Sequence, residues 1–349
     1  MSQRAADASI AYSFAVLGDI WTGGGTPEPH SSGVITAAET SAGTSATSPA
    51  AATTSPGSAV TSPGVAVTTP GSAVTTPASA RAQFWIVYQG DCRKVLQDLP
   101  AASMNCVVTS PPYFWQRDYG VDGQSGMEPT IDGFVAGLRE VFDGLRRVLT
   151  PDGTAWLNLG DTYYSAKGRP HGRDAKHRSR RLPGLRAVDG PGLGLPRKSL
   201  IGIPWRVALA LQQDGWTLRS AVAWVRSSSL PEPTARDRPW RTYEHVFLFS
   251  RGPRYFFDRG GLDGEEDVWL IEPDRNSDSR GSHYAPYPRA LVQRCVRAGC
   301  PDGGVVLDPF LGGGTTMSAA LAIGRSAVGI ELNPAFCDQV AARLRSRPG

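Results

Sequence analysis

The few cysteines of this sequence show no pairing pattern. There are five, none in a Cys-x-x-Cys spacing, and they are Cys92, Cys106, Cys295, Cys300 and Cys337. Scattered cysteines are typical of a reduced, cytoplasmic protein and not of a disulfide framework or a zinc site. We therefore expect a cytoplasmic location and no metal.

Long apolar runs are also missing. No run approaches the roughly 18 residues that a membrane-spanning helix needs. Residues 10–20 are weakly apolar, but they include Asp19 and have a poor charged lead-in, which argues against a signal peptide. The net charge of +4 is too small to indicate a partner by itself. We expect no membrane association.

The first 80 residues lack the composition of a folded core. They are dominated from residue 23 by Thr, Ser, Ala, Pro and Gly, and they echo a short unit, as in residues 54–60 and 69–74. Such a segment buries too little apolar surface to offset the entropy of ordering the chain. We predict a disordered low-complexity segment at 1–80 and one catalytic domain at 81–349.

The most informative stretch is residues 107–115, Val-Val-Thr-Ser-Pro-Pro-Tyr-Phe-Trp. An apolar run stopped by Pro111 and Pro112 predicts a short buried strand, because proline removes a donor of the strand ladder. Ser110 and Tyr113 then lie in a stiff loop at the carboxyl end of that strand. In an open α/β sheet ligands bind at this end.

A second stretch, residues 305–316, reads Val-Val-Leu-Asp-Pro-Phe-Leu-Gly-Gly-Gly-Thr-Thr. It predicts a strand, a glycine-rich turn and a helix whose amide groups face a ligand. The following strand ends in Glu331, an acidic residue that can accept hydrogen bonds from a ribose diol. A phosphate loop of the Walker type is excluded, since no lysine precedes Thr315. The pattern favours a cofactor that contains adenosine.

These stretches resemble two motifs of the amino-methylating DNA methyltransferases. Residues 108–113 resemble the catalytic loop of their cytosine-N4 branch, and residues 308–316 resemble their S-adenosyl-L-methionine loop. The catalytic loop precedes the cofactor loop, as in the circularly permuted β class. The resemblance covers residues 84–345 and implies an α/β, Rossmann-like methyltransferase fold. We expect a seven-stranded mixed sheet with helices on both faces and one antiparallel strand near the edge.

The resemblance also implies roles for individual residues. Ser110, Pro111, Pro112 and Tyr113 correspond to the catalytic loop. The residues expected at the cofactor are Asp91, Asp308, Phe310, Gly312, Gly314, Thr315, Glu331 and His283. For Asp91 an N-cap of the next helix is an equally good interpretation. His283 is a candidate general base, but a structural role is the better interpretation. Asp161 is either a pocket residue or a turn former.

Other segments have regular patterns. Helices are predicted at 93–99, 134–149, 203–213, 289–298, 316–322 and 334–344. Strands are predicted at 84–88, 106–108, 154–159, 217–225, 245–250, 305–307 and 326–330, with an edge hairpin at 255–257. The interval 258–267 leaves little room for a separate target-recognition domain.

Residues 167–198 carry ten Lys or Arg against two Asp, with six Gly and four Pro. A solvated surface loop is the default interpretation of such a run. Because the other motifs indicate DNA, we expect a flexible basic loop that neutralises phosphates without choosing the sequence. The residues expected to contact DNA are Arg173, Lys176, Arg178, Arg180 and Arg181.

The chemistry follows from the catalytic loop. The exocyclic amine of a base is a poor nucleophile, and the Ser110 hydroxyl and Pro111 carbonyl can accept its hydrogen bonds. Tyr113 can stack on a base flipped out of the duplex. Methylation at cytosine C5 is excluded, since it needs a thiolate, normally from a Pro-Cys loop, and no cysteine follows a proline. A sulfonium methyl donor requires no metal.

We therefore expect a site-specific DNA (cytosine-N4) methyltransferase of a restriction–modification or phage-like system, with duplex DNA and a cognate restriction endonuclease as partners. The first alternative is an adenine-N6 enzyme of the same class, where Asp or Asn usually replaces Ser110. Another is a DNA-binding relative that lost catalysis. RNA or a small molecule is a weaker substrate candidate. A Rossmann oxidoreductase would leave the Ser-Pro-Pro-Tyr loop without a role.

Overall fold

The computed structural model describes residues 20–22, 83–167, 187–226, 235–262, 264, 266–274 and 287–346. The helices are α2 (Cys92–Asp98), α3 (Ile131–Val148), α4 (Ile203–Gln213), α5 (Arg289–Gly299), α6 (Thr315–Ala322) and α7 (Pro334–Arg345), with a 3-10 turn, η2 (Arg259–Gly261). The strands are β1 (Ile20–Thr22), β2 (Trp85–Gln89), β3 (Met104–Thr109), β4 (Leu149–Leu159), β5 (Thr217–Val225), β6 (Tyr243–Ser250), β7 (Val268–Leu270), β8 (Val305–Asp308) and β9 (Ser326–Glu331).

All strands belong to one sheet, in the order β1-β2-β9-β8-β3-β4-β6-β5-β7. The strands from β2 to β4 run parallel, β6 is antiparallel to both β4 and β5, and β7 is parallel to β5. The expected mixed, largely parallel sheet is confirmed. The count of seven is wrong, because two short edge strands, β1 and β7, extend the sheet at its two ends.

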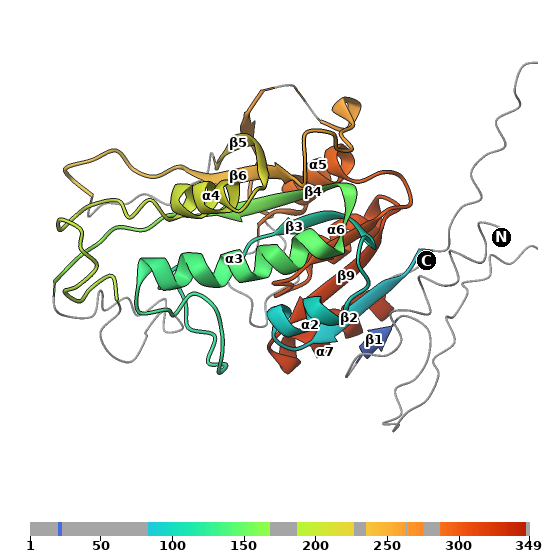
Figure 1. Cartoon of the computed structure of the whole chain (residues 1–349), viewed down its shortest axis with the longest axis horizontal. Helices are drawn as coiled ribbons and strands as arrows, with labels where there is room; N and C mark the ends of the chain where they lie inside the picture. The colour runs from blue at the N-terminus through green and yellow to red at the C-terminus, as the bar shows by residue number, and fades with distance from the viewer. Residues whose placement is uncertain are drawn as a thin grey trace, which may run out of the picture.

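Helices cover both faces of the sheet, as expected (Figure 1). One buried core lies under α2, α3 and α4 and includes Leu96, Phe134 and Val207. The other lies under α5, α6 and α7 and includes Val292 and Met317. Since both faces are covered, the central strands are apolar on both sides, which explains their continuous apolar runs.

Local sequence signals account for most element bounds. Pro204 lies in the first turn of α4, where its missing amide proton costs nothing. Thr130 caps α3 by accepting a hydrogen bond from the Gly133 amide, and the apolar residues of α3 at helical spacing are buried. The bounds predicted for α4 and β5 agree residue for residue.

Two expectations need correction or limitation. Residues 255–257 form no strand, because an aromatic run becomes a strand only where a neighbouring strand offers pairing. Tyr255 instead stacks under Arg219, and the Phe256 amide donates to the Asp152 carbonyl. Ile20–Thr22 lie within the segment predicted to be disordered, yet they pair with β2. The rest of residues 1–80 lies outside the described residues.

The segment expected as a flexible basic loop is fixed to the domain at its end. Val188 and Asp189 are fully buried. The Val188 carbonyl accepts from the Ser165 amide, and the Asp189 carboxylate accepts from the Ser165 hydroxyl at 2.7 Å. At these residues the segment is held against the domain, and residues 168–186 lie outside the described residues. Among the described residues, no helix is long and apolar enough to cross a membrane.

Candidate active site

A cavity of about 840 Å³ opens at the carboxyl ends of β2, β3, β4, β8 and β9. Parallel strands end at the same edge of the sheet, so their terminal residues meet there although they are far apart in sequence. The predicted site residues that line this cavity are Asp91, Ser110, Pro111, Pro112, Tyr113, Asp308, Phe310, Gly312, Thr315 and Glu331. His283, Arg173, Lys176, Arg178, Arg180 and Arg181 lie outside the described residues.

The glycine-rich turn between β8 and α6 forms one wall of the cavity. Gly312 and Gly314 have φ angles of 49° and 74°, a left-handed conformation that glycine adopts without strain. A Cβ at Gly314 would lie 2.8 Å from Val340, so this glycine also lets α7 pack closely against the turn. Gly314 is the N-cap of α6, and the helix begins at Thr315, which lines the cavity, so the helix N-terminus with its unpaired amides lies at the cavity wall.

Glu331, at the end of β9, holds the glycine turn in place. Its two carboxylate oxygens accept from the Gly312 amide at 2.7 Å and the Asn333 amide at 2.8 Å. Burial raises the pKa of Glu331, although these two hydrogen bonds act in the opposite direction. The side chain lines the cavity, so a carboxylate that is already oriented by the backbone faces any ligand there.

Asp91 lies where both of its interpretations from the sequence place it, at the start of a helix and at the cavity. It caps α2 by accepting from the Arg93 amide at 3.0 Å, and it lines the cavity as well. Its carboxylate forms an ion pair with the Arg93 guanidinium at 2.7 Å. Burial acts to raise the pKa of Asp91, but the hydrogen bonds and charge of Arg93 outweigh it and keep the pKa below its usual value.

Asp308, at the end of β8, is a buried carboxylate surrounded by hydroxyl groups. It accepts from Thr109 at 2.7 Å, from Thr316 at 2.5 Å and from Tyr287 at 3.3 Å. The Phe310 amide donates to it as well. Burial raises its pKa, and the hydroxyl hydrogen bonds oppose that shift. Asp308 thus ties the catalytic strand, the glycine turn and the segment before α5 together.

The Pro-Pro loop after β3 is anchored by the aromatic residues that follow it. Phe114 is buried against Phe134 with ring centroids 5.5 Å apart. The indole of Trp115 donates to the Glu128 carbonyl at 2.5 Å, and the Trp115 amide donates to the Gly126 carbonyl at 2.7 Å. These contacts fix the loop, so Ser110 keeps one position at the cavity wall.

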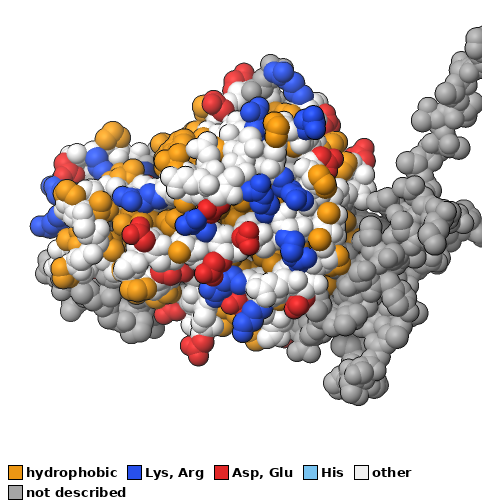
Figure 2. Space-filling view, in the orientation of Figure 1, with side chains coloured by type: hydrophobic (Ala, Val, Ile, Leu, Met, Phe, Trp, Pro, Cys, Tyr) orange, Lys and Arg blue, Asp and Glu red, His pale blue; other side chains and the backbone are white. Residues whose placement is uncertain are grey.

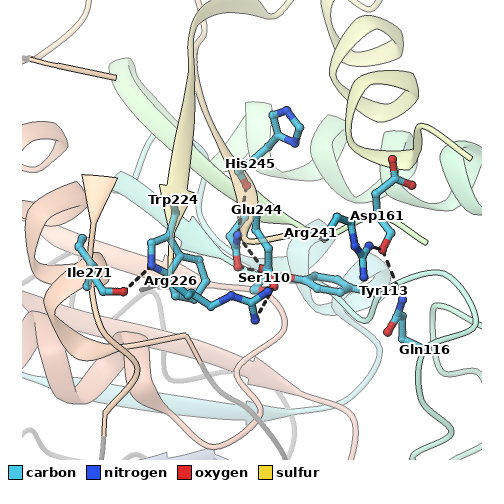
Figure 3. Close-up of polar contacts among 11 residues, drawn as sticks. Ser110, Tyr113, Gln116, Asp161, Trp224, Arg226, Arg241, Glu244, His245 and Ile271 are labelled. Atoms are coloured by element: carbon cyan, nitrogen blue, oxygen red, sulfur yellow. Dashed lines mark hydrogen bonds and ion pairs between the residues drawn. The ribbon is translucent and has the colours of Figure 1, made fainter. Parts of the chain in front are cut away.

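Tyr113 points its hydroxyl at Glu244 of β6, a residue that sequence reasoning missed (Figure 3). The distance between the hydroxyl and the Glu244 carboxylate is 2.6 Å, and the Ser110 hydroxyl donates to Tyr113 at 3.3 Å. Asn158 and Arg226 complete the cluster around the carboxylate. A charged residue at the start of an apolar strand was the one available signal for Glu244.

Asp161, which had two interpretations, serves as a cap. Its carboxylate accepts from the amides of Thr162 at 2.8 Å, Gly202 at 3.0 Å and Ile203 at 3.2 Å, so it holds the start of α4. It also lines the cavity. Burial raises its pKa against the effect of those hydrogen bonds. The local structural role is therefore established by the geometry.

Comparison with known proteins gives one family and several relatives. A family model described as "DNA methylase" matches residues 104–342. The chain is 40% identical over 270 residues to the Type II methyltransferase M.XycI of Xanthomonas campestris pv. cyanopsidis, covering 75% of this chain and 88% of the relative. The same identity over 269 residues is found with the Type II methyltransferase M.SmaI of Serratia marcescens, covering 74% and 90%.

Solved structures confirm the fold. The PvuII DNA methyltransferase (cytosine-N4-specific) superposes with a TM-score of 0.58 at 20% identity, covering 76% of this chain and 87% of its own. The putative DNA modification methylase TTHA0409 of Thermus thermophilus, in its complex with S-adenosyl-L-methionine, gives a TM-score of 0.51 at 24% identity and covers 74% and 91%. At these identities the likeness establishes the architecture alone.

Proposed function

The chain belongs to this DNA methylase family and is a DNA methyltransferase, and we propose that it methylates the exocyclic N4 amine of cytosine in duplex DNA. The observation that carries the proposal is the position of Ser110. Ser110 lines the same cavity as the glycine turn and Glu331. A base amine and a methyl donor can therefore meet in one cavity.

The methyl donor that fits this cavity is S-adenosyl-L-methionine, which supplies a methyl group on a positively charged sulfur. The residues that would hold it are Asp91, Phe310, Gly312, Thr315 and Glu331. The fit rests on the left-handed glycine turn, on the amides at the start of α6 and on the oriented Glu331 carboxylate. A cavity of about 840 Å³ is within the usual size range of cofactor and ligand sites.

The loop supplies acceptors for the target amine. The Ser110 hydroxyl and the Pro111 carbonyl accept hydrogen bonds from the amine and draw it toward tetrahedral geometry. Because the loop is anchored by Phe114 and Trp115, these acceptors are in place before the base enters, and positioning accounts for much of the rate. The base has to leave the duplex stack to reach the loop, at a cost of a few kcal/mol.

The choice of cytosine over adenine rests on Ser110, since Asp or Asn is usual at this position in the adenine-N6 enzymes that the chain also resembles. The Type II names of M.XycI and M.SmaI support a restriction–modification setting with a cognate endonuclease. We expect DNA from cells that express the chain to resist cleavage by such an enzyme.

Affinity for duplex DNA is proposed to come in part from Arg173, Lys176, Arg178, Arg180 and Arg181. On the face shown in Figure 2, the described Lys and Arg side chains are interspersed with Asp and Glu. The proposal assigns phosphate contacts to the basic segment, residues 167–198, because it carries ten Lys or Arg against two Asp.

The test is incubation of the full chain with labelled S-adenosyl-L-methionine and mixed-sequence DNA, followed by mass spectrometry of the nucleosides. We expect N4-methylcytosine, and we expect Ser110→Ala to lower its yield at least 100-fold while Ser346→Ala, in the exposed turn after α7, leaves it unchanged. N6-methyladenine would overturn the base assignment. Cofactor binding without any methylated nucleoside would favour a DNA-binding relative that lost catalysis.

A further inference from the structure

Three side chains form a continuous path of hydrogen bonds from the catalytic loop to β6 (Figure 3). The Ser110 hydroxyl donates to the Tyr113 hydroxyl at 3.3 Å. The Tyr113 hydroxyl donates to the Glu244 carboxylate at 2.6 Å, the shorter of its two contacts with an acceptor. The path therefore begins at the group proposed to touch the target amine and ends at an ionisable oxygen.

The Glu244 carboxylate is held from two neighbouring strands. Arg226, which directly follows β5, forms an ion pair with it at 3.3 Å, and the Asn158 amide of β4 donates to it at 3.3 Å. Asn158 also donates to the His245 carbonyl at 3.1 Å, which fixes the orientation of its amide and leaves its oxygen toward Tyr113. Only 14% of the Glu244 side chain is exposed.

The proposed reaction creates a proton that must leave. An amine that gains a methyl group becomes cationic and loses one N–H proton, and the Ser110 hydroxyl that accepts it has to release its own. A carbonyl such as that of Pro111 accepts a hydrogen bond but is too weak a base to keep a proton. The loop by itself therefore holds no group that can retain this proton.

We propose that Glu244 is the terminal proton acceptor of methyl transfer, reached from the target amine through the hydroxyls of Ser110 and Tyr113. The inference rests on the proposed function. It makes Glu244 a residue that acts through Tyr113 and does not touch the base.

The step balances in atoms and charge. The bond between the amine nitrogen and the methyl carbon forms as the carbon–sulfur bond breaks, and the electron pair of that bond stays on sulfur. The amine proton moves to the Ser110 oxygen, the serine proton moves to the Tyr113 oxygen, and the tyrosine proton moves to Glu244. Both hydroxyls end as they began, and the carboxylate becomes a carboxylic acid beside Arg226.

The environment of Tyr113 favours a transfer in which the protons move together. Burial, followed by the negative charge of Glu244 and the hydrogen bond to it, raises the pKa of Tyr113 well above its ordinary value. A free tyrosinate is therefore disfavoured, and in the proposed step the tyrosine passes one proton on as it receives another. The charge of Arg226 acts in the opposite direction on Tyr113 and compensates the Glu244 carboxylate before transfer.

Other ionisable groups surround this path. His245 lies next to Glu244 on β6, and burial lowers its pKa. Asp161 follows β4, and its carbonyl accepts a hydrogen bond from Arg241, which precedes β6 (Figure 3). Variants of Glu244 retain all three groups. The charge of Glu244 raises the pKa of His245, so Glu244→Gln would also move the titration of His245 to lower pH. Loss of the fall in rate at acidic pH, and not its displacement along the pH axis, therefore reports on Glu244.

The experiment is a rapid-quench measurement of single-turnover methyl transfer to DNA, from acidic to alkaline pH. In the parent enzyme we expect the rate to fall in acid, because a protonated Glu244 cannot accept another proton. Glu244→Gln keeps an oxygen that can accept from Tyr113 but cannot take the proton. We expect it to lower the rate constant about 100-fold and to leave the cofactor dissociation constant unchanged. We also expect a smaller fall of the rate in acid, which is the acid limb of the pH profile.

Two further variants separate proton transfer from support of the loop. Glu244→Asp restores a carboxylate, and we expect it to recover part of the rate and the acid limb. Tyr113→Phe interrupts the path, and we expect it to resemble Glu244→Gln. Glu140→Gln, the same change on the exposed face of α3, controls for loss of one charge and should match the parent.

The outcomes distinguish the two proposals. If the parent methylates DNA and Glu244→Gln keeps its rate, or keeps the acid limb at a reduced rate, the relay is wrong and Glu244 merely supports the loop. If the parent yields no methylated nucleoside although it binds the cofactor, the proposed function fails and the relay fails with it. Glu244→Asp without any recovery above Glu244→Gln would also overturn the relay.

Discussion

Thr109 and Asp308 are 199 positions apart, and the threonine hydroxyl donates to the buried carboxylate at 2.7 Å. Thr109 ends the strand that carries the catalytic loop, and Asp308 ends the strand that carries the glycine turn. The hydrogen bond therefore joins the two halves of the site at their bases. Because it is buried and its acceptor is a carboxylate, its loss has a measurable cost.

Thr109→Val replaces the hydroxyl by a methyl group of similar size and leaves the carboxylate with one hydrogen bond fewer. We expect the free energy of unfolding to fall by about 1.5–3 kcal/mol, as for hydrogen bonds to charged groups. Urea denaturation at neutral pH measures the change. The same substitution at Thr217, at the start of β5 and away from the cavity, is the control and should have a smaller effect. Equal effects would show that the hydrogen bond contributes nothing specific.

Asp308 should also leave a signature in the pH dependence of stability. Burial raises the pKa of Asp308 in the folded chain above its ordinary value of 3.8. In the pH window between the ordinary and the raised pKa, the folded state holds a proton that the unfolded state has lost. Raising the pH through this window therefore lowers the free energy of unfolding. Asp308→Asn removes this contribution. We expect a shallower decline with pH than in the parent, measured by urea denaturation in steps across the window; an identical slope would contradict the assignment.

Gly160 should be sensitive to the smallest side chain. A Cβ there would lie 2.6 Å from Cε2 and 3.0 Å from Cδ2 of Tyr113, so the ring would have to move. We expect Gly160→Ala to lower the free energy of unfolding by about 1–3 kcal/mol, the usual cost of overpacking, and to slow methyl transfer because Tyr113 is displaced, with cofactor affinity unchanged. Urea denaturation, single-turnover kinetics and calorimetry measure the three quantities. Gly252→Ala, where a Cβ meets nothing within 4 Å, is the matched control.

Glu331 is expected to contribute to cofactor affinity through the glycine turn as well as by direct contact. Glu331→Gln keeps an oxygen for one of the two amides, while its NH2 group faces the other, at Gly312 or Asn333. We expect the dissociation constant for S-adenosyl-L-methionine to rise at least tenfold, by calorimetry. Asp338→Asn, on the exposed side of α7, is the control and should leave this dissociation constant unchanged. An unchanged dissociation constant in Glu331→Gln would show that the turn needs no support from Glu331.

The basic segment predicts a dependence on salt. Single alanine substitutions at Arg173, Lys176, Arg178, Arg180 and Arg181 should weaken DNA binding about equally for all sequences. Each should reduce the slope of log affinity against log salt by about 0.9 for every phosphate that is no longer neutralised. Fluorescence anisotropy at several salt concentrations measures the slope, with Arg345→Ala at the end of α7 as control. Unchanged slopes would assign DNA affinity to another surface.

The sequence by itself determined the elements and the two motifs of the site. Apolar periodicity and Pro204 located α4, and a continuous apolar run located β5, because these signals act within a few residues of one another. The stop at Pro111 and the glycines after Phe310 placed both loops at strand ends. Strand ends in a parallel sheet meet, so one shared cavity followed.

Only the tertiary structure decided which side chains meet there. Glu244 reaches Tyr113 from 131 positions away because β6 pairs antiparallel with β4, opposite Asn158 and its neighbours. The order and register of those strands depend on pairing across the whole sheet, which local patterns do not encode. The same pairing left residues 255–257 without a strand partner. Local chemistry thus fixed where the loops end, and long-range packing fixed what surrounds them.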